Sequence, residues 1–199
     1  MEKAYGTVLN HGITAAILTH GQDRVLKTHA GRFDPPSHSI KCLKRERHVY
    51  ETIGRHPNIL EYYGAVEVDG DGGAAGICLE RARYDSVRAV LQQKIRLSDE
   101  VIEAIDHRQT RCRWIFQVAS ALSHLHSHSF LHCDVSCRNI VLTSSLDAKL
   151  IDFGSTAIAG EKGLGAEEGR YYCPSRFRID KLPSVRTDIF ALGSAMYEF

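Results

Sequence analysis

The sequence predicts an α+β fold in which strands and one helix precede residue 80 and helices dominate after it. Before residue 80 the apolar residues come in short runs between turn formers, such as residues 15–18 and 77–79, which are too short for helices. From Ser86 onward the apolar residues recur at the spacing of three and four that is typical of helices.

The composition is that of an ordinary globular protein, with 199 residues, 43% of them hydrophobic, and a formal net charge of +1. This length allows one sizeable core or two small lobes. The near-neutral charge gives no reason to expect a nucleic acid or an acidic membrane surface as a partner, and no apolar run approaches the roughly 20 residues of a membrane span. Six scattered cysteines without a C-x-x-C pair, and a start that lacks a signal pattern, favour a cytoplasmic protein with reduced thiols.

The first strands are expected within residues 5–29, where two apolar stretches, residues 15–18 and 25–26, are joined by a polar turn. Lys27 directly follows the second stretch. A further strand at residues 77–79 leads into Glu80 and Ala82.

Pro35 and Pro36 should break the chain, and a helix is expected from about Ser39 to about Gly54. Its buried face would carry Val49, Tyr50 and Ile53. Glu46 lies on this same side, whereas Glu51 lies on another face and should be solvated.

The segment Asp69-Gly70-Asp71-Gly72-Gly73 could be mistaken for a phosphate-binding loop. Because no Lys-Ser/Thr pair follows it, we interpret it as a hairpin turn.

Three helices are expected next. A short one contains Val87, Val90 and Leu91, and a second begins at Ser98, with acids in its first turn. The third is the central helix of this half, with a long apolar stripe formed by Trp114, Ile115, Val118, Ala119, Leu122 and Leu125.

Four histidines, His124, His126, His128 and His132, could indicate a metal site. Zinc requires ligands on one face and a closed coordination shell. Histidines placed at a helix end, where the helix dipole favours them, are the other interpretation, and we prefer it.

Residues 131–154 are the part of the chain around which the site should be built. Two short apolar runs, residues 140–142 and 150–151, predict a β-hairpin. Asp134 and Asn139 precede its first strand and Asp152 follows its second. Oxygen ligands that converge in this way suit a hard cation such as magnesium, held together with phosphates.

The spacing of these residues is specific. His132, Asp134 and Asn139 fit H-x-D-x-x-x-x-N, and Asp152 opens the D-F-G tripeptide after the hairpin. Together the two segments resemble the catalytic loop and the D-F-G motif of the eukaryotic protein kinase family. Either motif alone is weak evidence, but both in order favour the family over an ordinary hairpin with surface acids.

The resemblance implies a two-lobed protein-kinase-like domain over residues 1–199. Residues 1–80 would form a lobe with an antiparallel sheet and one helix. Residues 81–199 would form part of a mainly helical lobe, which lacks the family's last helices.

The resemblance also implies roles for particular residues in ATP- and Mg²⁺-dependent phosphoryl transfer to a protein substrate. Asp134 would be the catalytic base, and Asn139 and Asp152 would hold the metal. Lys27, fixed by Glu46, would contact the phosphates. The remaining nucleotide contacts would come from Gly12 in the first turn and from the backbone of Glu80 and Ala82, and a supporting column between the lobes would contain His132, Phe153, Tyr50 and Tyr62.

Several positions depart from the family pattern. Gly12 alone remains of the glycine-rich loop, and Ser175 replaces a glutamate that would form an ion pair. Cys133 replaces the arginine that usually neutralises a phosphorylated activation loop, so we expect activity without loop phosphorylation. Ser136 replaces a lysine near the transferred phosphate, and Arg138 is expected to make that contact instead.

Three functions remain open: an active protein kinase, with Ser/Thr favoured over Tyr as the acceptor, an ATP-binding pseudokinase scaffold, and an inactive truncated kinase fragment. The last helix should carry an exposed apolar face, for which a partner is expected. This face would comprise Ile189, Phe190, Leu192, Met196, Tyr197 and Phe199.

Overall fold

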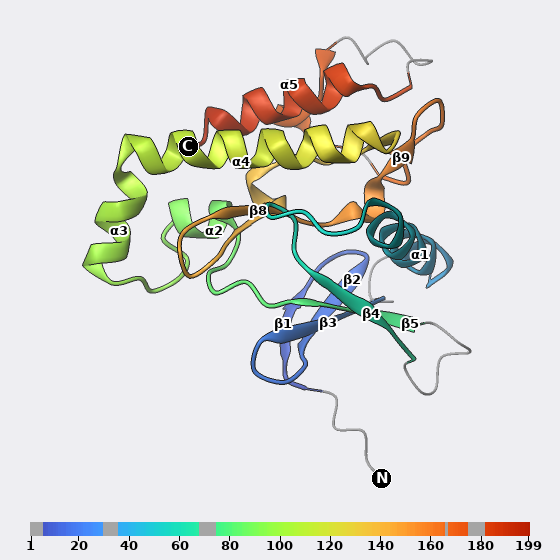
Figure 1. Ribbon diagram of the computed structural model, residues 1–199, viewed down its shortest axis with the longest axis horizontal. Coiled ribbons are helices and arrows are strands. Elements are labelled where there is room, and N and C mark those ends of the chain that lie inside the picture. The colour runs from blue at the N-terminus through green and yellow to red at the C-terminus, as the bar shows by residue number, and fades with distance from the viewer. Residues whose placement is uncertain (1–5, 30–35, 68–74, 166, 175–181) are drawn as a thin grey trace.

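The computed structural model describes residues 6–29, 36–67, 75–165, 167–174 and 182–199. The chain forms an α+β fold with two lobes, as Figure 1 shows: an antiparallel sheet with helix α1 beside it, and a larger part in which the long helices α4 and α5 lie next to each other. The predicted fold class is therefore confirmed.

The sheet contains five antiparallel strands in the order β1-β2-β3-β5-β4. The strands are β1 (Val8–His11), β2 (Ala15–Thr19), β3 (Arg24–His29), β4 (Tyr62–Glu67) and β5 (Ala75–Glu80). The prediction of a strand pair before the first helix was incomplete. β1 was missed: its apolar run, Val8 and Leu9, is only two residues long, and all four of its side chains are exposed.

Helix α1 (Pro36–Ile53) starts earlier than predicted, because Pro36 opens the helix instead of breaking the chain. Proline suits the first helical position, where its missing N–H costs no hydrogen bond. The helix ends as expected before Gly54, whose φ of +67° suits a residue without Cβ. Pro35 and the predicted turn at residues 69–73 lie outside the described residues.

The helices of the second lobe match the predicted order: α2 (Val87–Leu91), α3 (Asp99–Asp106), α4 (Arg108–Ser127) and α5 (Val185–Met196). Ser86 caps α2, accepting a hydrogen bond from the Ala89 N–H. On α4 the buried stripe includes Ala121, whereas the predicted Ile115 and Ala119 are only half-buried.

Short strands and turns follow α4. β7 (Ile140–Leu142) and β8 (Ala148–Leu150) form the predicted hairpin, and Ile151 lies just beyond it. β6 (Phe130–Leu131) pairs with β9 (Ala157–Ile158). Three 3₁₀ turns complete this region, at Cys137–Asn139, Phe153–Ser155 and Gly169–Tyr171.

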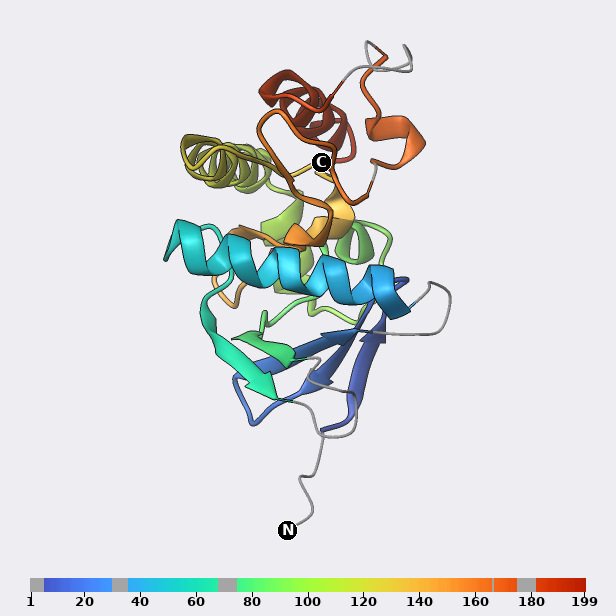
Figure 2. The same cartoon turned by 90° about the vertical axis from the view of Figure 1, so that its right-hand side faces the viewer.

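Helix α1 lies between the sheet and the helical lobe, as the rotated view shows (Figure 2). One apolar core runs through both lobes, from Val25 of β3 through Val49 of α1 to Leu125 of α4. Because the core is shared, residues of the two lobes can be held at fixed distances from each other. None of the described helices is long and apolar enough to cross a membrane.

The exposed apolar face predicted on the last helix is smaller than expected. Ile189, Phe190, Met196 and Tyr197 are exposed, but Leu192 is buried, and Phe199 packs edge-on against Trp114. The prediction placed Phe199 inside the last helix, but α5 already ends at Met196. The residues after Met196 therefore leave the helix, and Phe199 lies against Trp114.

Candidate active site

Lys27 is positioned by the alternation of strand β3. Val25 and Lys27 are two residues apart and therefore point to the same face of the sheet, the face that α1 covers. The Lys27 Nζ lies 2.6 Å from a Glu46 carboxylate oxygen and 2.8 Å from Asp152 Oδ1. The predicted pairing of Lys27 with Glu46 is therefore confirmed, and Asp152 is its second partner.

Glu46 belongs to the buried stripe of α1 and is 1% exposed. A charged residue in such a stripe is rarely buried without a partner. Glu51, the alternative, is exposed and pairs with Arg47 on the same helix at 2.8 Å. The two glutamates therefore lie on different faces of α1, one buried and one exposed, as the helical period predicted.

Asp152 adopts a left-handed backbone conformation, with φ of +67° and ψ of +72°. The chain then makes a tight turn against α1. A Cβ on Gly154 would lie 3.3 Å from the Cβ of Cys42, so glycine permits this close approach. The strained geometry at Asp152 aims its carboxylate at Lys27.

The pKa values of these three groups reflect burial and mutual attraction. Burial alone would lower the pKa of Lys27, but the charges of Asp152 and Glu46 outweigh it and raise that pKa. Partial burial opposes ionisation of Asp152, yet Lys27 lowers its pKa. Burial raises the pKa of Glu46, with Lys27 opposing the shift. Lys27 and Asp152 are therefore held in their charged forms.

Asp134 and Asn139 form the second half of the site. The Asn139 side-chain NH₂ donates to the Asp134 backbone oxygen at 2.8 Å and to Asp134 Oδ2 at 2.9 Å. Arg138 Nη2 also donates to Oδ2, at 2.9 Å. The other oxygen, Asp134 Oδ1, is buried and has no hydrogen-bond partner among the described residues.

Burial raises the pKa of the Asp134 carboxyl group, and the nearby Arg138 charge opposes this shift. Buried polar atoms are normally hydrogen-bonded, so the unpartnered Oδ1 requires an explanation. A carboxylate that is held rigid through one oxygen and has no partner on the other can receive a proton there from a bound hydroxyl group.

His132 connects this loop to Asp152. Its Nδ1 accepts from the Asp134 N–H at 3.2 Å, and its Nε2 lies 3.0 Å from the Ile151 carbonyl oxygen. These partners use each ring nitrogen once, with Nε2 as the donor. His132 therefore ties the residue before Asp152 to the loop that carries Asp134.

Asp188 of α5 is fully buried and anchors the same loop. Its carboxylate accepts from the backbone N–H groups of His132 at 2.8 Å and Cys133 at 3.0 Å, and pairs with His126 at 2.8 Å. Cys133 has a φ of +65°, a conformation that these bonds support. No local pattern in the sequence marks Asp188 as the side chain that anchors the catalytic loop.

The predicted column between the lobes is also present. The ring centroids of Tyr50 and Phe153 lie 5.0 Å apart, and those of Phe153 and His132 lie 5.5 Å apart. Tyr62 stacks on Tyr50 at 5.5 Å. The column crosses from the sheet lobe to the catalytic loop and holds the turn after Asp152 in place.

The family comparison agrees with this geometry. The sequence profile of the family described as "Protein kinase domain" matches residues 13–199. The chain belongs to the protein kinase family.

Relatives of the kinase domain are distant. The chain is similar to the serine/threonine-protein kinase RUNKEL of Arabidopsis thaliana, with 24% identity over 96% of this chain and 13% of that protein. It is similar to the mitogen-activated protein kinase kinase kinase mom-4 of Caenorhabditis elegans, with 28% identity over 80% of this chain and 28% of mom-4. It also resembles the Aurora kinase of Schizosaccharomyces pombe, with 31% identity over 80% of this chain and 41% of that protein. The chain thus spans less than half the length of each of these relatives.

Three further residues were predicted to contact the nucleotide, and the structure describes the position of each. Gly12 is in the turn between β1 and β2, where its N–H donates to the Ala15 oxygen at 2.8 Å. Glu80 ends β5, and its carboxylate binds Lys149 of β8 at 2.6 Å. Ala82 follows two residues later. Ser175, the position of the missing glutamate, lies outside the described residues.

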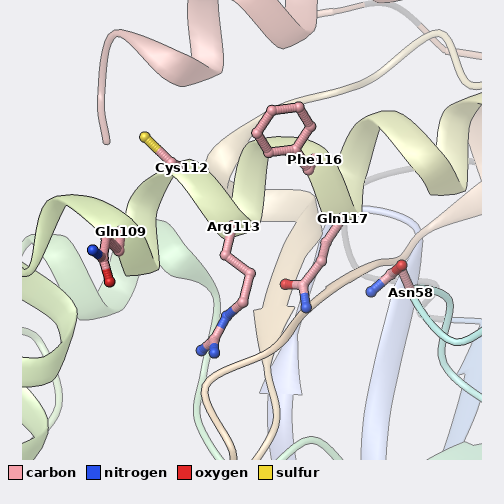
Figure 3. A pocket seen from close by; sticks show the side chains of 6 residues that line it. All are labelled: Asn58, Gln109, Cys112, Arg113, Phe116 and Gln117. Atoms are coloured by element: carbon pink, nitrogen blue, oxygen red, sulfur yellow. The ribbon is translucent and has the colours of Figure 1, made fainter.

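Two further features are not part of this site. The four histidines bind other partners: His124 and His128 contact carbonyl oxygens near helix ends, and among the described residues no group of histidine, cysteine and acidic residues could hold a metal ion. A hollow of about 460 Å³ lies beside α4, lined by residues such as Phe116 and Arg113 (Figure 3), and it contains none of the kinase residues.

The sequence carried no signal for Glu168. This residue lies between Asp152 and α5, in the segment after the D-F-G tripeptide. Its Oε1 accepts from Arg138 Nη1 and from Arg88 Nη1, each at 2.8 Å. Arg138 therefore bridges the carboxylates of Asp134 and Glu168, a contact that the motifs alone do not predict because Glu168 is 30 residues from Arg138.

Proposed function

We propose that this kinase domain transfers the γ-phosphate of ATP to a hydroxyl group of a protein substrate, with Mg²⁺ as cofactor. The observation that carries the proposal is the pairing of two arrangements at the junction of the lobes. One is the Lys27 ammonium held between Glu46 and Asp152. The other is the Asp134 carboxylate, fixed through Oδ2 and without a hydrogen-bond partner at Oδ1 among the described residues.

The donor atoms fit the metal. Because the Asn139 NH₂ group is bound to Asp134, its Oδ1 is the atom available for a cation. Asp152 supplies carboxylate oxygens, and magnesium prefers oxygen ligands. When bound, Mg²⁺ would neutralise charge on the phosphates. Asn139 and Asp152 are the residues that we propose to hold it.

The nucleotide would be held by groups from both lobes. Lys27, kept charged by its two partners, would bind the phosphates. The Arg81 N–H donates to the Asp23 backbone oxygen beside β3 at 3.0 Å, and the Glu80 N–H donates to the Glu61 oxygen at 2.9 Å. Glu80 would therefore contact the nucleotide through its carbonyl oxygen, and Ala82 through its backbone groups on the same side of the extended chain. We assign the adenine contacts to these two residues and the covering turn to Gly12.

In this mechanism Asp134 Oδ1 accepts the proton of the substrate hydroxyl group, and Arg138 acts beside it as a phosphate contact. The protein's contribution is to position groups and to stabilise charge, and no covalent intermediate with the protein is needed. We favour Ser or Thr as the acceptor, as in the name of the RUNKEL kinase, and phosphoamino-acid analysis of the labelled product tests this choice.

We also propose a cytoplasmic location, supported by six cysteines that are scattered through the sequence without a C-x-x-C pair.

A second function, an ATP-binding pseudokinase scaffold, is favoured by one observation. The turn between β1 and β2 contains Gly12 as its single glycine, so fewer backbone groups can approach the phosphates closely than in a glycine-rich loop. A pseudokinase would bind Mg²⁺ and ATP without transferring phosphate.

Substitution of Asp134 tests the proposal. With ATP labelled at the γ-phosphate and a general protein substrate, Asp134→Asn should reduce the turnover number by about 10²–10⁴-fold, the usual contribution of a placed base. ATP affinity should barely change, because other residues hold the nucleotide. Asp106→Asn, an exposed acid on α3, is the matched control and should retain full turnover.

The outcomes separate the two functions. Equal turnover by Asp134→Asn and the parent chain would remove Asp134 from the mechanism. A parent chain that binds Mg²⁺ and ATP but transfers no phosphate would favour the scaffold over the enzyme.

A further inference from the structure

A network of ion pairs with alternating charges extends from α2 to the catalytic loop. Arg88, on α2 (Figure 1), donates to Glu168, and Glu168 also accepts from Arg138. Arg138 in turn donates to Asp134 at 2.9 Å. This ion-pair network thus joins three separate segments: α2, the catalytic loop, and the segment 155–171 that follows the D-F-G tripeptide.

The two carboxylates that bind Arg138, those of Asp134 and Glu168, fix the orientation of its guanidinium group. A guanidinium group is planar, and its N–H groups point in fixed directions. Nη2 binds Asp134 and Nη1 binds Glu168, so the two carboxylates hold the plane from opposite ends. With Glu168 absent, one end of Arg138 would have no partner in this network, and its half-exposed side chain could turn toward water.

Glu168 is itself held firmly. Arg88 is 20% exposed in its side chain and contacts Glu168, the hydroxyl oxygen of Tyr171 at 2.9 Å and a Glu198 oxygen at 3.8 Å. Tyr171 is fully buried three residues after Glu168. The pKa of Glu168 is lowered by its hydrogen bond from Arg88, against partial burial and with the help of Arg138, so this carboxyl group is ionised at neutral pH.

We propose that Glu168 is a positioning residue for phosphoryl transfer: its permanent carboxylate fixes segment 155–171 on the catalytic loop and aims Arg138 at Asp134. This inference rests on the proposed function. Cys133, the neighbour of Asp134, is buried and uncharged, so it offers no cation for a phosphate on the segment. Glu168 and Arg138 make the contact between segment and loop without any modification.

The kinetic test compares Glu168→Gln with the parent chain. We expect the turnover number to fall by about 10–100-fold, with KM for ATP nearly unchanged, because Arg138 would no longer be held on Asp134. Glu168→Asp retains the charge and should recover most of the lost turnover. Glu161→Gln removes an exposed carboxylate from the same segment and should match the parent chain.

The split between the turnover number and KM separates positioning from a general loss of structure. Arg138 is held between Asp134 and Glu168, so its release should slow the transfer step and leave ATP binding as it is. An unchanged turnover number in Glu168→Gln, or no recovery in Glu168→Asp, would overturn the proposal.

Hydrogen exchange gives a readout that needs no activity. Amides in residues 157–165 and 167–171 should exchange faster in Glu168→Gln than in the parent chain, while Glu161→Gln should match the parent. If the parent chain transfers no phosphate, the proposed function fails, and exchange alone then decides whether Glu168 anchors the segment. Unchanged exchange would overturn the anchor.

Phosphatase treatment tests the claim that no modification is required. The parent chain should keep its turnover number after treatment. A large loss of rate on dephosphorylation would show that a phosphate, and not Glu168, fixes the segment.

Discussion

The ion pair of Lys27 with Glu46 is nearly buried, and this decides what its removal should cost. Glu46 is 1% exposed, so water cannot replace a lost partner. Breaking a buried pair by removing one member typically costs about 3–5 kcal/mol, although the raised pKa of Glu46 allows it to take up a proton and reduce that cost.

We therefore predict that Lys27→Met lowers the free energy of unfolding by a few kcal/mol, as measured by urea denaturation. The double variant Lys27→Met/Glu46→Gln should lose less than the sum of the single variants, because no charge is then left at the fully buried position 46. Arg47→Met removes the exposed partner of Glu51 and should cost less than about 1 kcal/mol. Similar losses from the buried and exposed pairs would contradict this account.

Residues that a motif or the helical period marks could be predicted from the sequence. Pairs of residues that only the tertiary fold brings together could not. Glu46 was distinguished from Glu51 because the two lie on different helical faces. Glu168 and Asp188 are ordinary acids by local pattern. Their partners Arg88 and His132 lie 80 and 56 residues away along the chain, and no period connects such positions.

At the scale of elements, short strands and turns were the hardest to predict. β1 is exposed throughout and has only Val8 and Leu9 as apolar residues, whereas the buried stripe of α4 extends over several turns and was recognised. Pro36 was misinterpreted because a proline can end one element or open the next, and the residues after the proline decide between the two.

The aromatic column joins α1, the turn after Asp152 and the catalytic loop, and Phe153 is its middle member. Phe153 is fully buried between Tyr50 and His132. We predict that Phe153→Ala lowers the free energy of unfolding by about 3–5 kcal/mol, the usual loss for a buried phenylalanine. Phe116→Ala on α4, where the ring is 75% exposed, should cost less than about 0.5 kcal/mol. Equal effects in denaturant unfolding would show that the column does not stabilise the fold.

At the scale of the whole molecule, the proposed nucleotide site draws on both lobes. Lys27 and Glu46 come from the sheet and α1, while Asn139 and Asp152 flank the hairpin of the helical lobe. A ligand that binds these groups together stabilises the folded arrangement of both lobes, since the unfolded chain does not bring them near each other.

We therefore predict that Mg²⁺ with ATP raises the melting temperature of the chain. At a ligand concentration of 100 times Kd the added stability is about 2.7 kcal/mol, and for a domain of 150–250 residues each kcal/mol shifts the melting temperature by about 2–4 °C. The expected shift is thus several degrees, and it should shrink when EDTA removes the metal, because Asn139 and Asp152 then lose the cation that links them to the phosphates. Lys27→Met should reduce the shift for a different reason, the loss of its own phosphate contact, and Arg47→Met should leave it intact. A melting temperature that does not respond to saturating Mg²⁺ and ATP would contradict nucleotide binding by this chain, whatever its family.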